Sequence, residues 1–458
     1  MSPRLPTVPT AEPLEAFATH FDDLFSRRNQ RQKLRRYLEG LLLSSQRNKT
    51  LTALANAQPI VGALYPSVQA LQYFLSESCW HAQWVNARRK KLLRECPQTA
   101  PTAQGALVID ETGDRKDGKR TAHVARQYLA NLGKVDNGVV SVTSVYADER
   151  LYYPLEVEPY TPSSWFEKGK KDPTFRTKPQ IALELVQREV QEGMPFRAVI
   201  ADCFYGENDE FVSGLERNEG GPLGFVLSLK RSHCWWHREG DVGSLLEAAQ
   251  LARWEGPDKE AEWEPVVRTF ADGHEETWYA LEVRTKAYSP EQSVRAVVVT
   301  TDPASLPEAN TWFLMTNLPA PDSARVGQSP LAPATLEEVV RLYGLRNWIE
   351  QSYKQVKQAL GWAQYQVRSD AAIRRHWTLV MCAFSFVWWN QSRSETEMEA
   401  IAEKKGGGVC FPPLLAALAP KGSFLVRTVD TGLAHLAGVD EFTAARGIVA
   451  SVGEYAPG

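Results

Sequence analysis

The chain has 458 residues, of which 43% are hydrophobic and 23% charged, and these proportions exclude a mainly disordered protein. Lysine and arginine number 52 against 55 aspartate and glutamate residues, so the net charge of −3 does not by itself indicate a nucleic-acid-binding protein. The most apolar run, Trp377 to Trp389, is shorter than the roughly 20 residues of a transmembrane helix. With no apolar signal segment and six scattered cysteines, we expect a cytoplasmic chain with reduced thiols and no membrane contact.

The first hundred residues have the composition of helices and carry local clusters of positive charge. A helix is predicted between Leu24 and Leu43, where few residues are β-branched. Arg31 and Arg35 lie in this helix among further basic residues. Helices with such side chains can enter a major groove or bind phosphates. We therefore predict a helical N-terminal DNA-binding domain over residues 1–100.

Residues 101–232 alternate between β-rich and helical segments, which predicts a mixed α/β unit. Strands are expected at 106–110, 138–148, 151–160, 197–202 and 224–229, and helices at 180–192 and 208–218. Asp110 and Asp202 each end an apolar strand, where active sites gather in α/β sheets. A carboxylate at that position suits a hard divalent cation. The alternative for either aspartate is a turn residue at the end of a strand.

Strands dominate the next segment, 233–335, and are expected at 264–270, 275–286, 293–301 and 311–317. A long helix is predicted from about Leu336 to Leu360, followed by another from about Asp370 to Trp389. These helices define a segment over 336–395. The remaining residues, 396–458, contain no decisive signal, and their role is unknown.

Five polar residues of the first of these helices share one face because they are spaced by three, four or seven positions: Tyr343, Arg346, Glu350, Lys354 and Lys357. The simple interpretation is a solvated face that is stabilised by pairs such as Arg346 with Glu350. The alternative is that the face carries chemistry, since the apolar residues of the same helix can supply its buried side.

Three segments carry a resemblance to a known family. The spacing Tyr343, Arg346, Glu350 and Lys357 is similar to the Y-R-E-K signature of bacterial insertion-sequence transposases, which are DDE enzymes. The segment around Asp110, VIDETGDRKDGKRTAHVARQYLANLGKVDNGVVSV, resembles the same group. So do FRTKPQIALELV and the VIADCFYGEN that follows it. The chain resembles the insertion sequence 701 group in particular, over roughly residues 100–395.

The resemblance implies an α/β fold with an RNase H-like mixed sheet core and an α-helical N-terminal domain. The core consists of 101–232 and 336–395, the second part holding the Glu helix, and the β-rich insertion 233–335 interrupts it. The resemblance further implies that Asp110, Asp202 and Glu350 are catalytic and bind two Mg²⁺ ions, which Mn²⁺ can replace. Phosphodiester cleavage needs an activated hydroxyl and relief of charge on the leaving oxygen, which two carboxylate-bound ions supply.

DNA contacts are expected from two groups of residues. The resemblance implies that Tyr343, Arg346 and Lys357 bind phosphates near the cut, and Lys354 lies on their face of the helix. A second group follows Asp110 closely and either lines a DNA path or forms a solvated loop: Lys116, Lys119, Arg120 and Arg126. The insertion also offers Trp263, Trp278 and Trp312, which either stack on a flipped base or pack in the sheet.

The predicted function is that of a DNA transposase. It cleaves the ends of an insertion sequence and joins the freed 3′-OH to target DNA in a cut-and-paste reaction. Its partners would be double-stranded terminal inverted repeats, target DNA and a second copy of the chain on DNA. It would need no nucleotide cofactor and would act in a bacterial cytoplasm, associated with the nucleoid.

Three alternatives remain at this point. An RNase H-like nuclease would use the same acids without strand transfer. A domesticated DNA-binding protein would have lost catalysis. A carbohydrate hydrolase would suit two strand-end carboxylates, but it does not explain the spacing from Tyr343 to Lys357.

Overall fold

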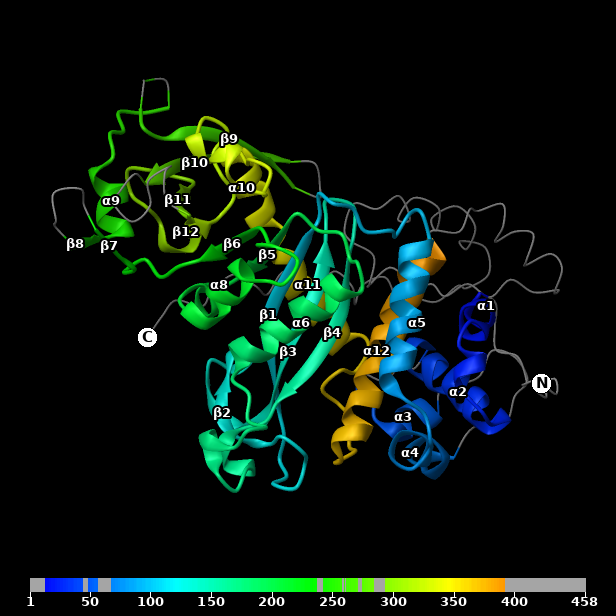
Figure 1. Cartoon of the computed structure of the whole chain (residues 1–458). Coiled ribbons are helices and arrows are strands. Elements are labelled where there is room, and N and C mark those ends of the chain that lie inside the picture. Colours follow the sequence, from blue (N-terminus) through cyan, green and yellow to red (C-terminus); the bar gives the residue numbers. More distant parts are fainter. Residues whose placement is uncertain are drawn as a thin grey trace, which may run out of the picture.

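A computed structural model describes residues 13–43, 48–56, 67–236, 242–257, 259, 261–270, 274–283 and 293–391 (Figure 1). Within these ranges the chain forms one ten-stranded mixed sheet, a small two-stranded sheet and helices on both faces of the large sheet. No helix in the described ranges is long and apolar enough to cross a membrane. The predicted C-terminal region, 396–458, lies outside the described residues.

Five strands of the large sheet form a part that we call the core sheet: β1 (Ala106–Arg115), β3 (Lys134–Ala147), β4 (Tyr152–Tyr160), β5 (Ala198–Ala201) and β6 (Phe225–Ser228). Their order is β4-β3-β1-β5-β6. The pairs β4-β3 and β3-β1 are antiparallel, whereas β1-β5 and β5-β6 are parallel. This order and these directions are those of an RNase H-like sheet, so the predicted fold class is confirmed.

The β-rich segment continues the same sheet from its β6 edge. β12 (Thr311–Thr316) pairs with β6, and β11 (Arg295–Thr300), β10 (Glu275–Val283) and β9 (Glu264–Thr269) follow as antiparallel neighbours. α9 (Leu245–Leu251) and the hairpin of β7 (Cys234–Trp236) and β8 (Val242–Ser244) precede these strands. The division of the chain into the five predicted domains stays a prediction.

Helices cover opposite faces of the core sheet, as the alternation of side chains along β1 shows. Glu111 pairs with Lys178 at the start of α6 (Lys178–Gln191), at 2.6 Å. Asp110, its neighbour, pairs with Arg346 at the start of α11 (Asn347–Gln358), at 3.1 Å. Since successive residues of a strand point to opposite faces, α6 and α11 lie on opposite sides of β1.

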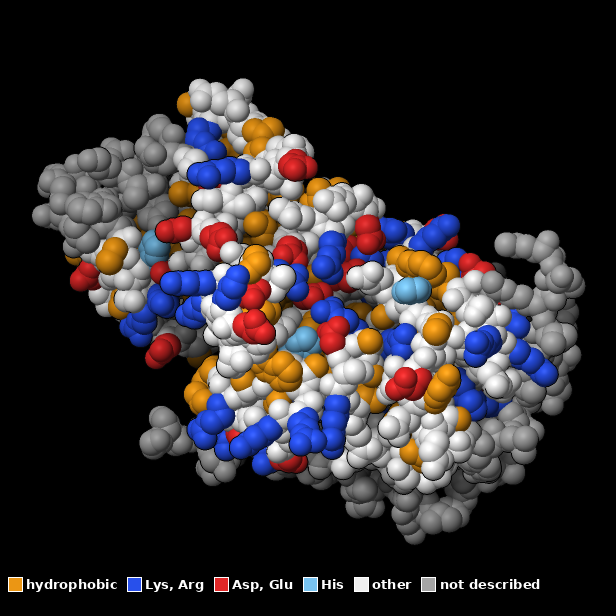
Figure 2. Space-filling model, turned by 60° about the horizontal axis from the view of Figure 1, so that its bottom comes forward, with side chains coloured by type: hydrophobic (Ala, Val, Ile, Leu, Met, Phe, Trp, Pro, Cys, Tyr) orange, Lys and Arg blue, Asp and Glu red, His pale blue; other side chains and the backbone are white. Residues whose placement is uncertain are grey.

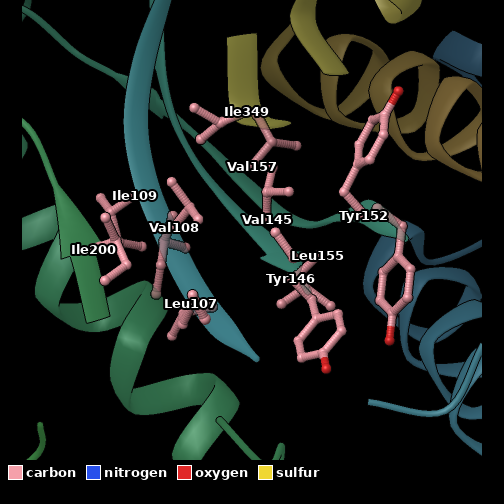
Figure 3. Packing of buried hydrophobic residues seen from close by; sticks show 14 of the residues in the cluster. Leu107, Val108, Ile109, Val145, Tyr146, Tyr152, Leu155, Val157, Ile200 and Ile349 are labelled. Atoms are coloured by element: carbon pink, nitrogen blue, oxygen red, sulfur yellow. The ribbon is translucent and has the colours of Figure 1, made fainter. Parts of the chain in front are cut away.

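Hydrophobic side chains of the sheet and helices form the core beneath α11. Ile109 of β1 points, like Glu111, to the α6 face of the sheet. On the α11 face, Ile349 of α11 lies beside Val157 of β4, and both are buried (Figure 3). Burying such a side chain stabilises the fold by about 1.5–3 kcal/mol, so this packing fixes the height of α11 above the sheet.

The prediction of a single helix from Leu336 to Leu360 is wrong, because the structure has two helices in this segment. α10 (Leu336–Gly344) ends at a glycine, a weak helix former, and α11 begins at Asn347. Between them the amides of Leu345, Arg346, Trp348 and Ile349 bond to carbonyls three residues back, at 3.0–3.1 Å. This tighter winding redirects the chain just before the predicted catalytic glutamate.

The N-terminal segment is helical, as predicted, and packs beside the sheet (Figure 1). It contains α1 (Leu14–Thr19), α2 (Arg28–Leu43), α3 (Leu51–Ala55), α4 (Val68–Ser76) and α5 (Ala82–Glu95). These helices surround the long α12 (Asp370–Gln391), and α5 also contacts β4. The helical segment therefore shares a core with the end of the described chain.

Candidate active site

The register of the core sheet brings the two predicted catalytic aspartates together. β1 and β5 are parallel, with Val108 paired to Ile200. Two residues further along each chain, the same register places Asp202 beside Asp110. On the other side of β1, Asp110 pairs with Thr143 of β3. Two carboxylates separated by 92 positions in the sequence therefore lie side by side at one point of the sheet.

Asp202 is held by the turn that follows β5. Its side chain caps the short helix α7 (Cys203–Gly206) by accepting a hydrogen bond from the amide of Phe204, at 3.0 Å. α7 packs so closely on β6 that a Cβ on Gly206 would come within 2.0 Å of the Ser228 carbonyl oxygen. Glycine at position 206 is thus needed to keep this turn, and with it Asp202, against the sheet.

Glu350 reaches the same region from α11, and Arg346 lies between it and the sheet. The Arg346 guanidinium donates to Asp110 Oδ2 at 3.1 Å and to Glu350 Oε1 at 3.2 Å. Its Nε is buried and has no hydrogen-bond partner among the described residues. About half of the Glu350 side chain is exposed. A single cation therefore links carboxylates from β1 and α11 at the surface.

The electrostatic surroundings of Asp110 favour its neutral form when no further cation is present. Burial raises the pKa of Asp110 to about 7, Arg346 opposes this shift, and the neighbouring Asp202 adds to it. Burial acts to lower the pKa of Arg346, but Asp110, Tyr343, Asp202 and Glu350 outweigh burial and raise it. The site thus holds more negative than positive groups and has the charge to attract a cation.

The carboxylates of the site are suitable ligands for a divalent metal ion. In the described ranges, however, no three His, Cys, Asp or Glu side chains are arranged to hold one. Asp110 and Asp202 offer adjacent carboxylate oxygens, which hard cations such as Mg²⁺ prefer. The third carboxylate, Glu350, is bound to Arg346 instead of joining the aspartates. The metal-binding role of the three acids stays a prediction.

The last residue of the signature contacts a carboxylate that the sequence analysis did not single out. Lys357 pairs with Asp114 at 2.8 Å and donates to the Gly113 carbonyl oxygen at 2.9 Å. Asp114 is buried and lies four residues after Asp110, hence on the same face of β1. The alternation along the strand could have revealed it. Lys357 thereby fastens the end of α11 to β1.

The remaining helix residues differ in exposure. Tyr343 is buried, and burial raises its pKa. Its ring meets that of Trp312 edge-on, with centroids 5.0 Å apart. Trp312 is half-buried, whereas Trp263 and Trp278 are buried, so Trp312 is the tryptophan of the insertion that adjoins the site. Lys354 is exposed. A role of these residues in binding DNA stays a prediction.

The predicted basic group after Asp110 divides into one inward and three outward side chains. Lys116 donates to the Ala363 carbonyl oxygen at 2.7 Å, and its Nζ lies 3.3 Å from the centroid of the Tyr365 ring. Burial lowers the pKa of Lys116 to about 8. Lys119, Arg120 and Arg126 are exposed. The structure thus leaves these three, but not Lys116, free to meet DNA.

The two predicted arginines of the N-terminal helices are both buried. Arg35 makes ion pairs with Glu15 and Asp22, each at 2.7 Å. Arg31 is 5% exposed. Their burial favours a role in packing the helices together. It does not support the predicted contact of these two side chains with DNA.

Two further side chains, a lysine and a phenylalanine, lie near the carboxylates of the site. Lys178, which pairs with Glu111, also places its Nζ 5.3 Å from the centroid of the Phe204 ring. Phe204, two residues after Asp202, is 46% exposed. The sequence carries no signal for this position, because its exposure depends on the fold and single exposed apolar side chains are common on protein surfaces.

Comparisons with known proteins show what the chain is similar to. The model of a family described as DDE superfamily endonuclease matches residues 20–242. A probable transposase for insertion sequence element IS701 from Microchaete diplosiphon is 30% identical over 363 residues. That match covers 79% of this chain and 83% of the relative. Among solved structures, the NurA nuclease from Sulfolobus solfataricus matches 60% of this chain and 92% of its own, with 10% identity. Its TM-score of 0.25 is too low to support any argument.

Proposed function

The chain belongs to the IS701-like DDE transposases, and from this premise we propose that it cuts the ends of an insertion sequence and joins them to target DNA. The proposal is supported chiefly by one observation, the register that places Asp202 beside Asp110 in an RNase H-like sheet. Glu350, linked to Asp110 through Arg346, supplies the third carboxylate of the DDE class.

Two chemical steps would use this site in turn. In the first, water attacks the phosphodiester at the end of the element, and the broken P–O bond leaves a 3′-OH on that end. In the second, this 3′-OH attacks a phosphodiester of target DNA, and a target 3′ oxygen leaves. Each step exchanges one P–O bond for another, so neither needs ATP.

The chain's own residues would position the reacting groups. Asp110, Asp202 and Glu350 would hold two divalent ions, normally Mg²⁺, which activate the attacking hydroxyl and relieve charge on the leaving oxygen. Arg346 would turn from the carboxylates to a DNA phosphate, because its planar guanidinium binds either partner through paired hydrogen bonds.

The test is cleavage and joining of DNA that carries the sequences flanking the gene in its host, with Mg²⁺ and with EDTA. We expect Mg²⁺-dependent cutting at the boundary of the terminal repeats, joining to a second DNA, and loss of both activities in Asp202→Ala. Asp209→Ala is the matched control, because Asp209 lies at the exposed start of α8 (Asp209–Glu216), and it should retain both activities.

Other outcomes would point to the alternatives. Cutting without joining would favour a nuclease, and binding without cutting would favour a domesticated DNA-binding protein. Because two ends must be brought together, we further propose that two copies of the chain act on DNA. Cross-linking of the protein on DNA with paired ends, compared with single ends, checks that assembly.

A further inference from the structure

Two basic segments that are distant in sequence meet at one end of the core sheet. The first, 115–126, follows β1, and the second, 163–178, connects β4 to α6. The Trp165 indole donates a hydrogen bond to the Val124 carbonyl oxygen at 2.9 Å, so the two segments touch. The edge strand β2 (Ala125–Leu129) pairs with the first residues of β3 at the same place.

Six exposed cations gather there, and we call them the basic end: Lys119, Arg120, Arg126, Lys168, Lys170 and Lys171. None of the six makes an ion pair with an acid in the described part of the chain. This separates them from the neighbouring Arg115 and Lys134, which approach Asp136 within 4 Å. Figure 2, in which this end of the molecule comes forward, shows Lys and Arg side chains in a row beside exposed hydrophobic ones. Their positive charge is thus available to a polyanion.

Large apolar side chains lie exposed among these cations. Tyr128 and Val135 form a cross-strand pair of the β2–β3 hairpin and are 55% and 53% exposed. Trp165 is 46% exposed. Cations combined with a tyrosine hydroxyl and an indole fit the phosphates and sugars of a nucleic-acid backbone, for which Tyr, Lys and Arg are common partners. An acidic protein surface would use the cations but would leave these rings without a matching role.

The basic end continues from the candidate active site. Arg115 is five residues beyond Asp110 on β1, which corresponds to about 17 Å. A duplex rises 3.4 Å for each base pair, so this length spans about five base pairs. Lys178, paired with Glu111 on the α6 face of β1, lies close to the Phe204 ring, two residues after Asp202. Along β1 the basic end therefore begins about five residues beyond Asp110.

We propose that the basic end binds the sugar-phosphate backbone of the element's own end, beginning about five base pairs from the phosphate that is cut. The proposal rests on the proposed function, because it takes Asp110 and Asp202 as the point of cleavage. The element's own end is the occupant because it alone must lie across the site during the first step.

The experiment measures binding of full-length protein to end duplexes at several salt concentrations. The variants are Lys119→Glu with Arg120→Glu, and Lys168→Glu with Lys171→Glu. The matched control reverses the same number of charges at two exposed basic residues outside the N-terminal helices, Arg217→Glu with Lys259→Glu. One duplex extends about 15 base pairs on both sides of the cut, and a second ends about three base pairs from the cut on both sides, which is too short to reach the basic end.

We expect each basic-end variant to bind the long duplex about 10- to 100-fold more weakly than wild type, and the slope of log K against log salt to fall by about 2. Binding of the short duplex and the control variant should be unchanged. Slopes equal to that of the control would overturn the proposal, and so would normal end binding combined with a defect only in joining to target DNA. If wild type neither binds nor cuts end DNA, the proposed function itself fails, which is a distinguishable result.

Discussion

Two regions of this molecule each gather three carboxylates around a central cation. The two clusters differ in how deeply their charges are buried and in how completely they are paired. At the junction of α5, β4 and α6, Lys90 pairs with Glu156, Glu189 and Glu192 at 2.6–2.9 Å, and both Lys90 and Glu189 are fully buried. In the candidate active site, Arg346 binds Asp110 and Glu350 at 3.1–3.2 Å and leaves its Nε without a partner among the described residues. The number of carboxylates is the same, but Arg94 also pairs with Glu192, at 3.4 Å, so the first cluster has a second cation and is closed, whereas the second is open.

The difference separates a structural ion cluster from a functional one. In the closed cluster the ammonium group donates directly to the carboxylates, which balances their desolvation. In the open cluster Glu350 is half exposed, and Asp202 accepts a hydrogen bond from the Phe204 amide of its own turn. The open cluster has exposed carboxylate oxygens to offer to a further cation, whereas in the closed cluster the Oε2 of Glu189 that has no hydrogen-bond partner in the described part of the chain is buried. Neither property can be read from the charges alone.

The largest expected effect is on stability, in the closed cluster. Lys90→Met removes the cation and leaves Glu189 buried without its partner, at a position where burial already raises the pKa of Glu189 to about 7. We expect the free energy of unfolding to fall by about 3–5 kcal/mol at pH 8. Urea unfolding followed by circular dichroism measures this. A loss below about 1 kcal/mol would mean that the cluster is not closed in solution.

A second prediction concerns His376, which is buried on α12 between Tyr37 of α2 and the Gly361 carbonyl oxygen. Its Nδ1 is 2.7 Å from the Tyr37 hydroxyl of α2, and burial lowers its pKa to about 4 from an ordinary value of 6.5. The His376 ring therefore binds more protons in the unfolded than in the folded chain between pH 6.5 and 4, and its contribution to stability falls as the pH falls through this window. From pH 7 to pH 5 this contribution falls by about 2 kcal/mol. His376→Gln should lose less over the same range, and equal losses would exclude His376 as the cause.

Arg346→Gln removes the cation of the open cluster. Without the guanidinium, Asp110 and Glu350 lose their shared partner, and we expect about 1–2 kcal/mol of destabilisation in EDTA. Mn²⁺ should recover most of this loss, because an open cluster accepts a different cation. Urea midpoints of wild type and variant, with and without Mn²⁺, give the comparison. An equal loss in both media would show that Arg346 is purely structural, like Lys90.

The smallest expected effect on stability is at the basic end. Lys168→Glu with Lys171→Glu should change the free energy of unfolding by less than about 0.5 kcal/mol, because both side chains are exposed and unpaired among the described residues. The same protein should show the reduced salt slope in DNA binding. A stability loss above about 2 kcal/mol would mean that these lysines are part of the packing, and it would remove the contrast with Lys90.

The sequence predicted the RNase H-like core well because its strands are short, apolar and bounded by acids, as at Ala198–Ala201 before Asp202. Local spacing also located Glu350. The sequence-based prediction failed where tertiary packing determines the structure. The tight turn at Leu345 and Arg346 contains no proline that would have indicated it. Likewise Arg35 and Lys116 look as basic in sequence as Lys119 does, yet the fold buries the first two and exposes the third. Exposure depends on partners that are far away in the chain.

The most direct test of the account is the effect of Mn²⁺ on thermal unfolding of four proteins: wild type, Asp202→Asn, Glu350→Gln and Glu192→Gln. The three substitutions each replace one carboxylate by an amide, the first two in the open cluster and the last in the closed one. We expect Mn²⁺ to raise the Tm of wild type and of Glu192→Gln, and to leave the other two nearly unchanged. A full Mn²⁺ shift in both Asp202→Asn and Glu350→Gln, or its loss in Glu192→Gln, would contradict the assignment of the metal site to these carboxylates.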